Sequence, residues 1–315
     1  MSNASAQHNT QTFPPSLVAA TVLWCAVVGS GTVATKIANA GISPVFQAGL
    51  RSLIACFLVL GYCWLRGKKF NFFDASLVPG ICAGTFFGLE FWALFAGINH
   101  TTVARAVLFL YTAPFFVAPL AHWLIPNDKI SRSKLLGLIV AFVGVGLAFA
   151  DRLFPTGPAV VSALASVSAL PAASTLQGDL LCIAAAFFWA LSTIIVKATR
   201  LRTEAPEKNL VYQLATSAVL LLALAWLIGE PGVFASSTKV WLGFAYQTVV
   251  VASAGYLIWF MLIAKYSAST MHAFAFLSPI FGVIAGTLIL QEPLGWNIAA
   301  ALVMVALGLW LVNRG

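Results

Sequence analysis

Residues Thr101–Leu124 read T-T-V-A-R-A-V-L-F-L-Y-T-A-P-F-F-V-A-P-L-A-H-W-L, and this apolar stretch with a proline near its middle decides how the rest of the chain is interpreted. A shorter copy of the pattern begins at Tyr266. A shift of 165 positions places Pro114 on Pro279, with phenylalanines at matching positions on either side. The order and spacing of these matches predict that the chain contains two copies of one structural unit.

The composition makes lipid the main solvent of this chain. Of its 315 residues, 61% are hydrophobic and 8% are charged, whereas a soluble domain is about 25% charged. The formal charge of +8 does not predict nucleic-acid binding, because the basic residues lie in short clusters between apolar runs and form no basic face. The five cysteines lie in apolar runs without metal-ligand spacing, so we expect neither a disulfide framework nor a metal site.

The apolar runs have the length of membrane-spanning helices. A hydrocarbon core about 30 Å thick needs about 20 apolar residues per helix, and the sequence offers ten such runs. It therefore predicts an all-α integral membrane protein with ten transmembrane helices. Residues 1–16 are expected to form a tail, 17–150 a first unit of five helices, 151–178 a connection and 179–315 a second unit. The predicted helices are Leu17–Ala38, Val45–Leu65, Leu77–Ile98, Val103–Ile125, Leu135–Ala150, Leu180–Ala198, Leu210–Ile228, Val240–Ala264, Ser267–Leu290 and Trp296–Val312.

The basic residues orient these helices. Lysine and arginine accumulate in cytoplasmic turns, and eleven of the 17 basic residues lie on one side of the predicted bundle. They are Arg66, Lys68, Lys69, Lys129, Arg132, Lys134, Arg200, Arg202, Lys208, Lys265 and Arg314. Both termini are therefore predicted to be cytoplasmic. Because each unit has an odd number of helices, the second unit is predicted to run inverted relative to the first, an arrangement that many secondary transporters use for alternating access.

Two prolines lie at matching positions in the fourth and ninth predicted helices, Pro114 and Pro279. A proline inside a helix removes a backbone hydrogen bond and bends the helix. Paired breaks in corresponding transmembrane helices point to a central binding site, whose gate they would shape. The alternative is a pair of packing kinks without a mechanistic role.

Glu90 lies inside the third predicted helix, where a carboxylate is unfavourable unless it is paired, hydrated or protonated. At 1.5 Å per residue, Glu90 and Arg51 lie about 13 Å and about 10 Å from the outer turns, so they share a depth. Arg105, about 6 Å from the same surface, either joins them or extends to that surface. These charges are either a buried ion pair that fixes helix packing or a site for a proton or a substrate charge.

Aromatic residues make up 13% of the chain and crowd the helices just described. Phe109, Tyr256, Trp259 and Phe276 are candidates for the lining of an apolar pocket, with Tyr111 on the same stretch as Phe109. The alternative is ordinary packing. The tryptophans Trp24, Trp64, Trp123, Trp189, Trp226 and Trp241 lie mostly near helix ends, where interfacial belts are expected.

The sequence contains no catalytic fingerprint. It has no G-x-S-x-G, H-E-x-x-H, P-loop or dinucleotide motif, so we expect no enzyme, cofactor or metal centre. His272, in the ninth predicted helix, either titrates near neutral pH or only satisfies a backbone carbonyl. We favour the second interpretation, and we expect Lys36 and Lys197 to be helix-end lysines that extend to the surface.

The stretch quoted first, together with A-A-A-F-F-W-A-L-S-T-I-I-V-K (184–197) and L-S-P-I-F-G-V-I-A-G-T-L-I-L-Q-E-P-L (277–294), resembles the EamA-type transporters of the drug/metabolite transporter superfamily. The resemblance covers residues 17–312. It implies two inverted five-helix repeats and a carrier in the bacterial inner membrane that exports amino acids, other metabolites or drugs. Arg51 looks like the arginine that this family often places in its second helix, and the segment from Trp189 looks like its W-x7-K pattern.

These observations predict a secondary transporter that exports a small metabolite such as an amino acid, with or without proton coupling. Glu90 is expected to bind a proton or a substrate amine, while Arg51 or Arg105 offsets its charge. The connection 151–178 is then periplasmic, the partners are a small molecule and the lipid bilayer, and a monomer or a homodimer fits equally. The alternatives are an efflux carrier for lipophilic cations and a membrane-embedded binding or sensor protein that does not translocate.

Overall fold

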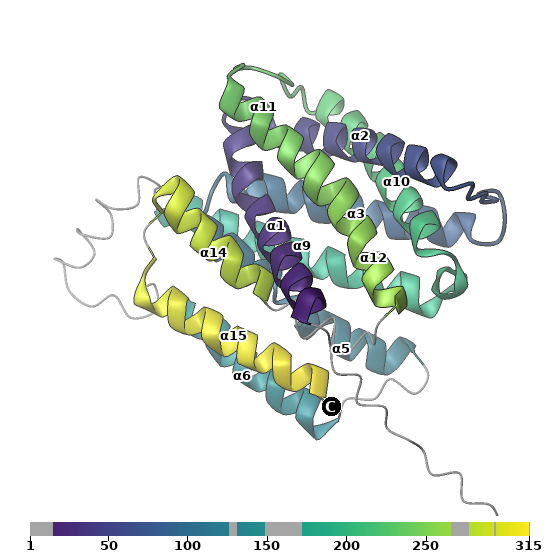
Figure 1. Cartoon of the computed structure of the whole chain (residues 1–315). Coiled ribbons are helices and arrows are strands. Elements are labelled where there is room, and N and C mark those ends of the chain that lie inside the picture. The colour runs from purple at the N-terminus through teal and green to yellow at the C-terminus, as the bar shows by residue number, and fades with distance from the viewer. Residues whose placement is uncertain (1–14, 126–130, 149–171, 266–276, 293, 315) are drawn as a thin grey trace, which may run out of the picture.

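The computed structural model describes residues 15–125, 131–148, 172–265, 277–292 and 294–314 (Figure 1). Their regular elements are helices, apart from one isolated β-bridge between two loops, which confirms the predicted all-α class. The helices are α1 (Pro15–Asn39), α2 (Pro44–Leu65), α3 (Leu77–Ile98), α4 (Val103–Leu110), α5 (Ala113–Leu124), α6 (Arg132–Ala148), α9 (Ala172–Ala198), η1 (Arg200–Thr203), α10 (Pro206–Leu227), α11 (Thr238–Ala245), η2 (Tyr246–Gly255), α12 (Tyr256–Lys265), α14 (Leu277–Leu290) and α15 (Trp296–Arg314).

Seven of the described helical segments are long and apolar enough to cross a membrane, and three shorter apolar segments lie in α6, α14 and α15. Large side chains on their outer surfaces, such as Trp64, Trp226 and Leu288, are at least 73% exposed. Apolar surfaces of this kind contact lipid in a membrane protein. The chain is therefore a multi-pass membrane protein. The described helices overlap all ten predicted ranges, and a topology of ten crossings stays a prediction.

The helices α2 and α10 are built alike and run antiparallel to each other. Each has 22 residues and starts with a proline at its first position, where the fixed φ of proline favours a helix start. Each is followed by a glycine with a positive φ, 65° at Gly67 and 71° at Gly229, which terminates a helix without strain. Lys68 at the end of α2 pairs with Glu207 at the start of α10, so the two helices point in opposite directions.

The fourth predicted helix is divided into α4 and α5 at Tyr111 and Thr112. Pro114 has no N–H with which to continue the hydrogen bonding of α4. The chain tightens there instead, because the Thr112 N–H donates to the Phe109 carbonyl at 3.1 Å and the Phe115 N–H donates to the Thr112 carbonyl at 2.9 Å. The predicted bend at Pro114 is therefore a break between two helices.

Two further boundaries differ from the prediction. The helix α9 begins at Ala172, so residues 172–178 of the predicted connection are helical. The eighth predicted helix consists of α11, the π-helical segment η2 and α12. The sequence pattern does not reveal a π-helix. Its residues are as apolar as those of an α-helix, and it differs in its backbone hydrogen bonds, which run between residues i and i+5.

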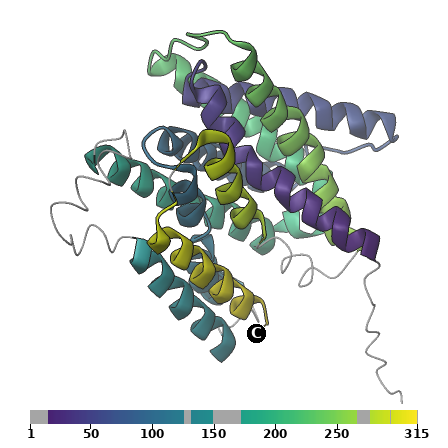
Figure 2. The ribbon, with the colours of Figure 1, turned by 60° about the vertical axis from the view of Figure 1, so that its left-hand side comes forward.

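Helices from the first part of the chain pack against helices from the second part. The helix α1 packs against α14, α11 and η2. In the same way, α9 packs against α3, α4 and α5. The helix α2 packs against α10, and α6 packs against α15. The α6–α15 pair is set off from the other helices in Figures 1 and 2. Its contact is close, because a Cβ on Gly308 would lie 2.4 Å from the Gly137 carbonyl oxygen.

Candidate functional site

Two opposite charges are buried inside the bundle, Arg51 on α2 and Glu90 on α3, with exposed fractions of 3% and 6%. The guanidinium of Arg51 lies over the ring of Phe91, 3.8 Å from its centroid, and 5.3 Å from the centroid of Phe95. Arg51 and Glu90 interact electrostatically, but they form no ion pair among the contacts of the described residues. Arg51 Nε and Nη2 and Glu90 Oε2 are buried without a hydrogen-bond partner.

The predicted pocket residue Tyr256 lies beside this pair, and its hydroxyl is a hydrogen-bond partner of the Arg51 guanidinium. Tyr256 follows directly after the π-helical segment η2. The last carbonyl of that segment, on Gly255, accepts a hydrogen bond from Trp24 Nε1 at 2.8 Å. Trp24 also stacks on Trp259, with ring centroids 4.4 Å apart and an interplanar angle of 10°. These contacts join α1 to the helix that positions Tyr256.

The interior position of Trp24 corrects the expectation of an interfacial residue. Trp24 is 9% exposed, and it uses its ring face and its N–H on two groups of the second part of the chain. Trp189 is partly buried and meets the ring of Tyr111 edge-on at 5.9 Å. The tryptophans Trp64, Trp123 and Trp226 are 77–80% exposed and fit the interfacial belt.

The break between α4 and α5 places Tyr111 against the start of α14. Its hydroxyl lies near Ser278, the residue before Pro279. Ser278 is 2% exposed. The two prolines therefore lie in segments that meet near the interior of the bundle. Two predicted site residues, His272 and Phe276, lie outside the described residues.

Arg105 belongs to a separate cluster. It binds Asp179 on α9 with two parallel hydrogen bonds, Nε to Oδ1 at 3.1 Å and Nη2 to Oδ2 at 2.7 Å. Asp179 is fully buried and also accepts a hydrogen bond from Thr101 Oγ1 at 2.8 Å. Arg105 lies 5.4 Å from the centroid of the buried Phe109 ring. The structure thus places Arg105 and Phe109 with Asp179, away from the contacts of Arg51.

A second ion pair adjoins this cluster. Lys36 at the end of α1 donates to Glu292 Oε1 at 2.6 Å and to the Thr101 carbonyl at 2.8 Å. The other oxygen of Glu292 accepts the Val103 N–H at 2.7 Å. This ion pair corrects the prediction that Lys36 extends to the surface, because a carboxylate within reach makes the ion pair the lower-energy choice. We call Lys36, Thr101, Arg105, Asp179 and Glu292 the outer network, because the charge distribution predicts that this end is outside.

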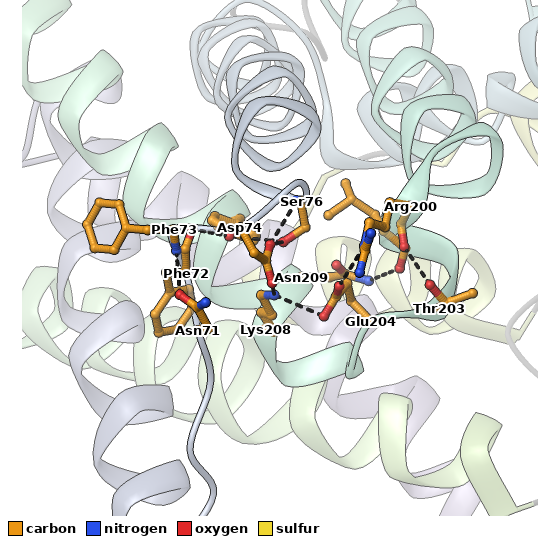
Figure 3. A network of polar contacts seen from close by, with 12 residues as sticks. Asn71, Phe72, Phe73, Asp74, Ser76, Arg200, Thr203, Glu204, Lys208 and Asn209 are labelled. Carbon is orange, nitrogen blue, oxygen red and sulfur yellow. Dashed lines mark hydrogen bonds and ion pairs between the residues drawn. The ribbon is translucent and has the colours of Figure 1, made fainter.

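A third polar cluster lies at the opposite end and holds the loop before α3 against the start of α10 (Figure 3). Lys208 donates to Asp74 Oδ2 at 2.8 Å and to Glu204 Oε2 at 2.9 Å. The Ser76 N–H and hydroxyl also donate to Asp74. Lys208 and then Ser76 hold the pKa of the Asp74 carboxyl well below its usual range. The whole arrangement is a structural clamp between two parts of the chain.

The sequence did not single out Asp179, Glu292 or Trp24 as site residues. Asp179 and Glu292 lie at predicted helix ends, where a carboxylate is usually solvated. The sequence does show that both carboxylates lie near basic residues in other outer turns. It does not show which basic residue each carboxylate binds, because that depends on how the helices pack. Among the residues that the structure describes, no group of three or more His, Cys, Asp or Glu side chains could hold a metal ion.

The fold and these charges define a multi-pass membrane protein with charged side chains buried inside a mainly apolar bundle. Residues 16–150 and 176–314 match the EamA-like transporter family, and the chain therefore belongs to this family. The predicted family is confirmed. Membership makes the protein a transporter, and a small-molecule substrate follows from that class.

Curated relatives agree with this family. YvbV, an uncharacterized transporter of Bacillus subtilis (strain 168), is 25% identical over 283 residues, which cover 89% of this chain and 85% of the relative. A probable amino-acid metabolite efflux pump of Salmonella typhimurium (strain LT2) is 26% identical over 299 residues, with 92% and 91% coverage. One solved crystal structure has a TM-score of 0.61 at 16% identity and covers 94% of this chain and 96% of its own, which shows a shared fold.

Proposed function

We propose that this protein is a secondary transporter that exports a small metabolite, such as an amino acid, across the bacterial inner membrane by alternating access. The single observation that carries the proposal is the buried pair of Arg51 and Glu90, of which Arg51 Nε and Nη2 and Glu90 Oε2 have no hydrogen-bond partner. Charged groups inside a membrane-spanning bundle are unfavourable without a partner and mark substrate or ion pathways. Tyr256, from the second part of the chain, completes the group.

Alternating access needs two units that move against each other, and the packing of the helices supports two inverted five-helix repeats. If the ten predicted helices are numbered along the chain, the first packs on the eighth and the ninth. The sixth packs on the third and the fourth. The second packs on the seventh, and the fifth on the tenth. Exchanging the two units reproduces the same set of pairs. The family pattern also matches two separate segments of the chain.

The proposed repeats are inverted because the matched helices α2 and α10 run antiparallel. Glu230, after the end of α10, accepts the Phe46 N–H at the start of α2 at 2.7 Å. At the other end of the pair, Lys68 after α2 binds Glu207 at the start of α10. Two helices with the same local design in opposite directions are what an inverted repeat requires.

Proton coupling is part of the proposal. A carboxylate such as Glu90 can hold either a proton or a substrate ammonium group, and occupancy by one excludes the other. Exchange of the two across the membrane would couple export of substrate to entry of protons. Polar coupling groups of this kind face the interior of transporters, as Glu90 does.

The test is counterflow in proteoliposomes with a panel of amino acids, amines and lipophilic cations, with and without a pH gradient. We expect one amino-acid class to exchange in the wild type and the gradient-driven component to vanish in Glu90→Gln. Wild-type exchange of lipophilic cations alone would identify a multidrug carrier. Binding without any exchange would identify a sensor. If Glu90→Gln matched the wild type under both conditions, Glu90 would be a packing residue and the coupling proposal would be wrong.

A further inference from the structure

The unused atoms of Arg51 all lie on one edge of its guanidinium group. The Tyr256 hydroxyl and the ring of Phe91 hold the guanidinium in place. The centroid of the Phe91 ring lies 3.8 Å from the guanidinium carbon, on one face of the group. Nε and Nη2 are left without partners, although they are buried. These two nitrogens point the same way and form the edge that binds a carboxylate with two parallel hydrogen bonds.

Elsewhere in the same chain, the corresponding edge of another arginine binds a carboxylate. Arg105 uses its own Nε and Nη2 on the two oxygens of Asp179, at 3.1 and 2.7 Å. That pair satisfies a fully buried carboxylate. Arg51 has the same edge in a comparably buried position, but no carboxylate of the described chain occupies it.

Glu90 does not fill this edge, even though it is buried nearby. Two opposite charges in a low-dielectric interior attract strongly, and a separated pair leaves both without compensation. Glu90 Oε2 has no donor, and Arg51 has two free donors. The ligand that would satisfy both must present two acceptor oxygens on one side and a cationic donor on the other. That description fits a zwitterion with a carboxylate and an ammonium group.

We propose that the Nε and Nη2 edge of Arg51 is the carboxylate subsite of the transporter and that Glu90 receives the ammonium group of the same substrate. This inference rests on the proposed transport function and assigns its site. It makes Arg51 the residue that distinguishes an amino acid from its amide, and Glu90 the residue that distinguishes an amino acid from its deaminated acid. Phe91 and Tyr256 act by holding the guanidinium in position.

The experiment compares three competitors in the counterflow assay: the amino acid that exchanges fastest in the panel, its α-amide and its deaminated acid. A site that hydrogen-bonds a group rejects analogues without it, and we expect the wild type to prefer the amino acid to the amide by at least about 100-fold. In Arg51→Gln the preference over the amide should fall to a few-fold, because the glutamine side chain cannot bind a carboxylate as a charged pair. In Glu90→Gln the preference over the deaminated acid should fall in the same way.

The matched control is Arg105→Gln, which removes the same charge from an arginine that binds Asp179. It should lower protein stability and leave the preference for the carboxylate at the wild-type level. A second variant, Arg51→Lys, keeps the charge and loses the two-nitrogen edge, so its preference should lie between those of the wild type and Arg51→Gln. Folding of each variant is checked by size-exclusion chromatography in detergent before reconstitution.

Two results would overturn the assignment. The first is a folded Arg51→Gln variant that keeps the full wild-type preference for the amino acid over its amide, which would make Arg51 a structural charge. If Arg51→Gln does not fold, the same result in folded Arg51→Lys would have the same meaning. If the panel showed exchange only of substrates without a carboxylate, the zwitterion site would be wrong while the transport function stood. Absence of any exchange would instead contradict the proposed function itself.

Discussion

At the scale of single residues, Gly29 makes a close contact between α1 and α14 possible. A Cβ at this position would lie 2.3 Å from the Ser278 carbonyl oxygen and 2.9 Å from the Gly282 nitrogen. Both neighbours are backbone atoms and cannot move aside. We predict that Gly29→Val separates the two helices and destabilises the protein by about 1–3 kcal/mol, measured as a lower thermal midpoint in detergent.

The matched control for this prediction is Gly61→Ala in α2, where a Cβ would meet nothing within 4 Å. Replacing glycine by alanine inside a helix stabilises it by about 0.5–1 kcal/mol, so the midpoint should stay level or rise. A normal midpoint in Gly29→Val would mean that the two helices do not cross this closely in the protein.

The two central charges were predictable from the sequence, but their surroundings were not. Counting helical rise placed Arg51 and Glu90 at one depth, and both are buried on neighbouring helices. Depth does not state which face of a helix a residue occupies or which helix lies opposite. Arg105 therefore had two open alternatives, and its binding to Asp179 is neither of them. Only the packing of α4 against α9 brings that pair together.

At the scale of elements, the ion pair of Lys36 and Glu292 ties the end of α1 to the turn before α15. We predict that Glu292→Gln destabilises the outer network by about 2 kcal/mol, since it removes a charged hydrogen bond. In an alternating-access cycle this end must open to the outside, so the variant should also make Thr101→Cys react faster with a water-soluble maleimide.

Charge reversal separates this effect from a general loss of stability. The double variant Lys36→Glu with Glu292→Lys should return part of the reactivity toward the wild-type value, because the ion pair can form again while the bonds to the Thr101 carbonyl and the Val103 N–H are lost. Neutralising Glu204, which binds Lys208 in the clamp at the opposite end, should leave the reactivity at the outer end unchanged. Equal reactivity in Glu292→Gln and the wild type would show that this ion pair does not hold the outer end closed.

The clamp at the opposite end gives a pH prediction. The folded-state pKa of Asp74 lies below its ordinary value because Lys208 and Ser76 bind the carboxylate. Such a group stabilises the fold at every pH above its unfolded pKa of about 3.9, and the contribution is lost as the pH falls toward the folded value. The difference in thermal midpoint between wild type and Asp74→Asn should therefore be constant from about pH 5 to 8 and shrink below about pH 4.

Asn71→Ala is the control for this pH dependence, since the Asn71 side chain bonds the exposed Phe73 N–H in the same loop and does not titrate. Its difference from the wild type should not change with pH. A difference for Asp74→Asn that already shrank near neutral pH would contradict the lowered pKa.

Some elements could be read from the sequence and others could not. Proline chemistry marked the interruption at Pro114, because the missing N–H acts locally. The sequence does not predict the π-helical segment η2, because its composition is that of any apolar helix. Its position next to Tyr256 and the bond from Trp24 to Gly255 depend on α1, which lies far away in the sequence. Local chemistry is visible in a sequence, whereas a contact between distant helices is not.

At the scale of the whole molecule, the similarity between the two units is clearer in the structure than in the quoted stretch. The helices α2 and α10 share a proline start, a tryptophan near the end and a glycine stop: Pro44, Trp64 and Gly67 against Pro206, Trp226 and Gly229. These matches follow a shift of 162 positions, which differs from the shift that pairs Pro114 with Pro279. An insertion or deletion between the matched segments would hide the proposed repeat from a search at one fixed shift.

The proposed inverted arrangement makes a prediction about the whole topology. Because α2 and α10 are antiparallel, the loop after α2 and the loop after α10 must lie on opposite sides of the membrane if both helices span it. The lysine and arginine distribution predicts that the first loop lies in the cytoplasm. In a variant without native cysteines, Lys239→Cys should therefore react with an impermeant maleimide in intact cells, whereas Lys69→Cys should react only after permeabilisation. Both positions are exposed in the structure, so access to the reagent depends on the side of the membrane alone. The reverse pattern would invert the predicted orientation and keep the repeat, while reaction of both positions in intact cells would place the loops on one side and contradict the antiparallel spans.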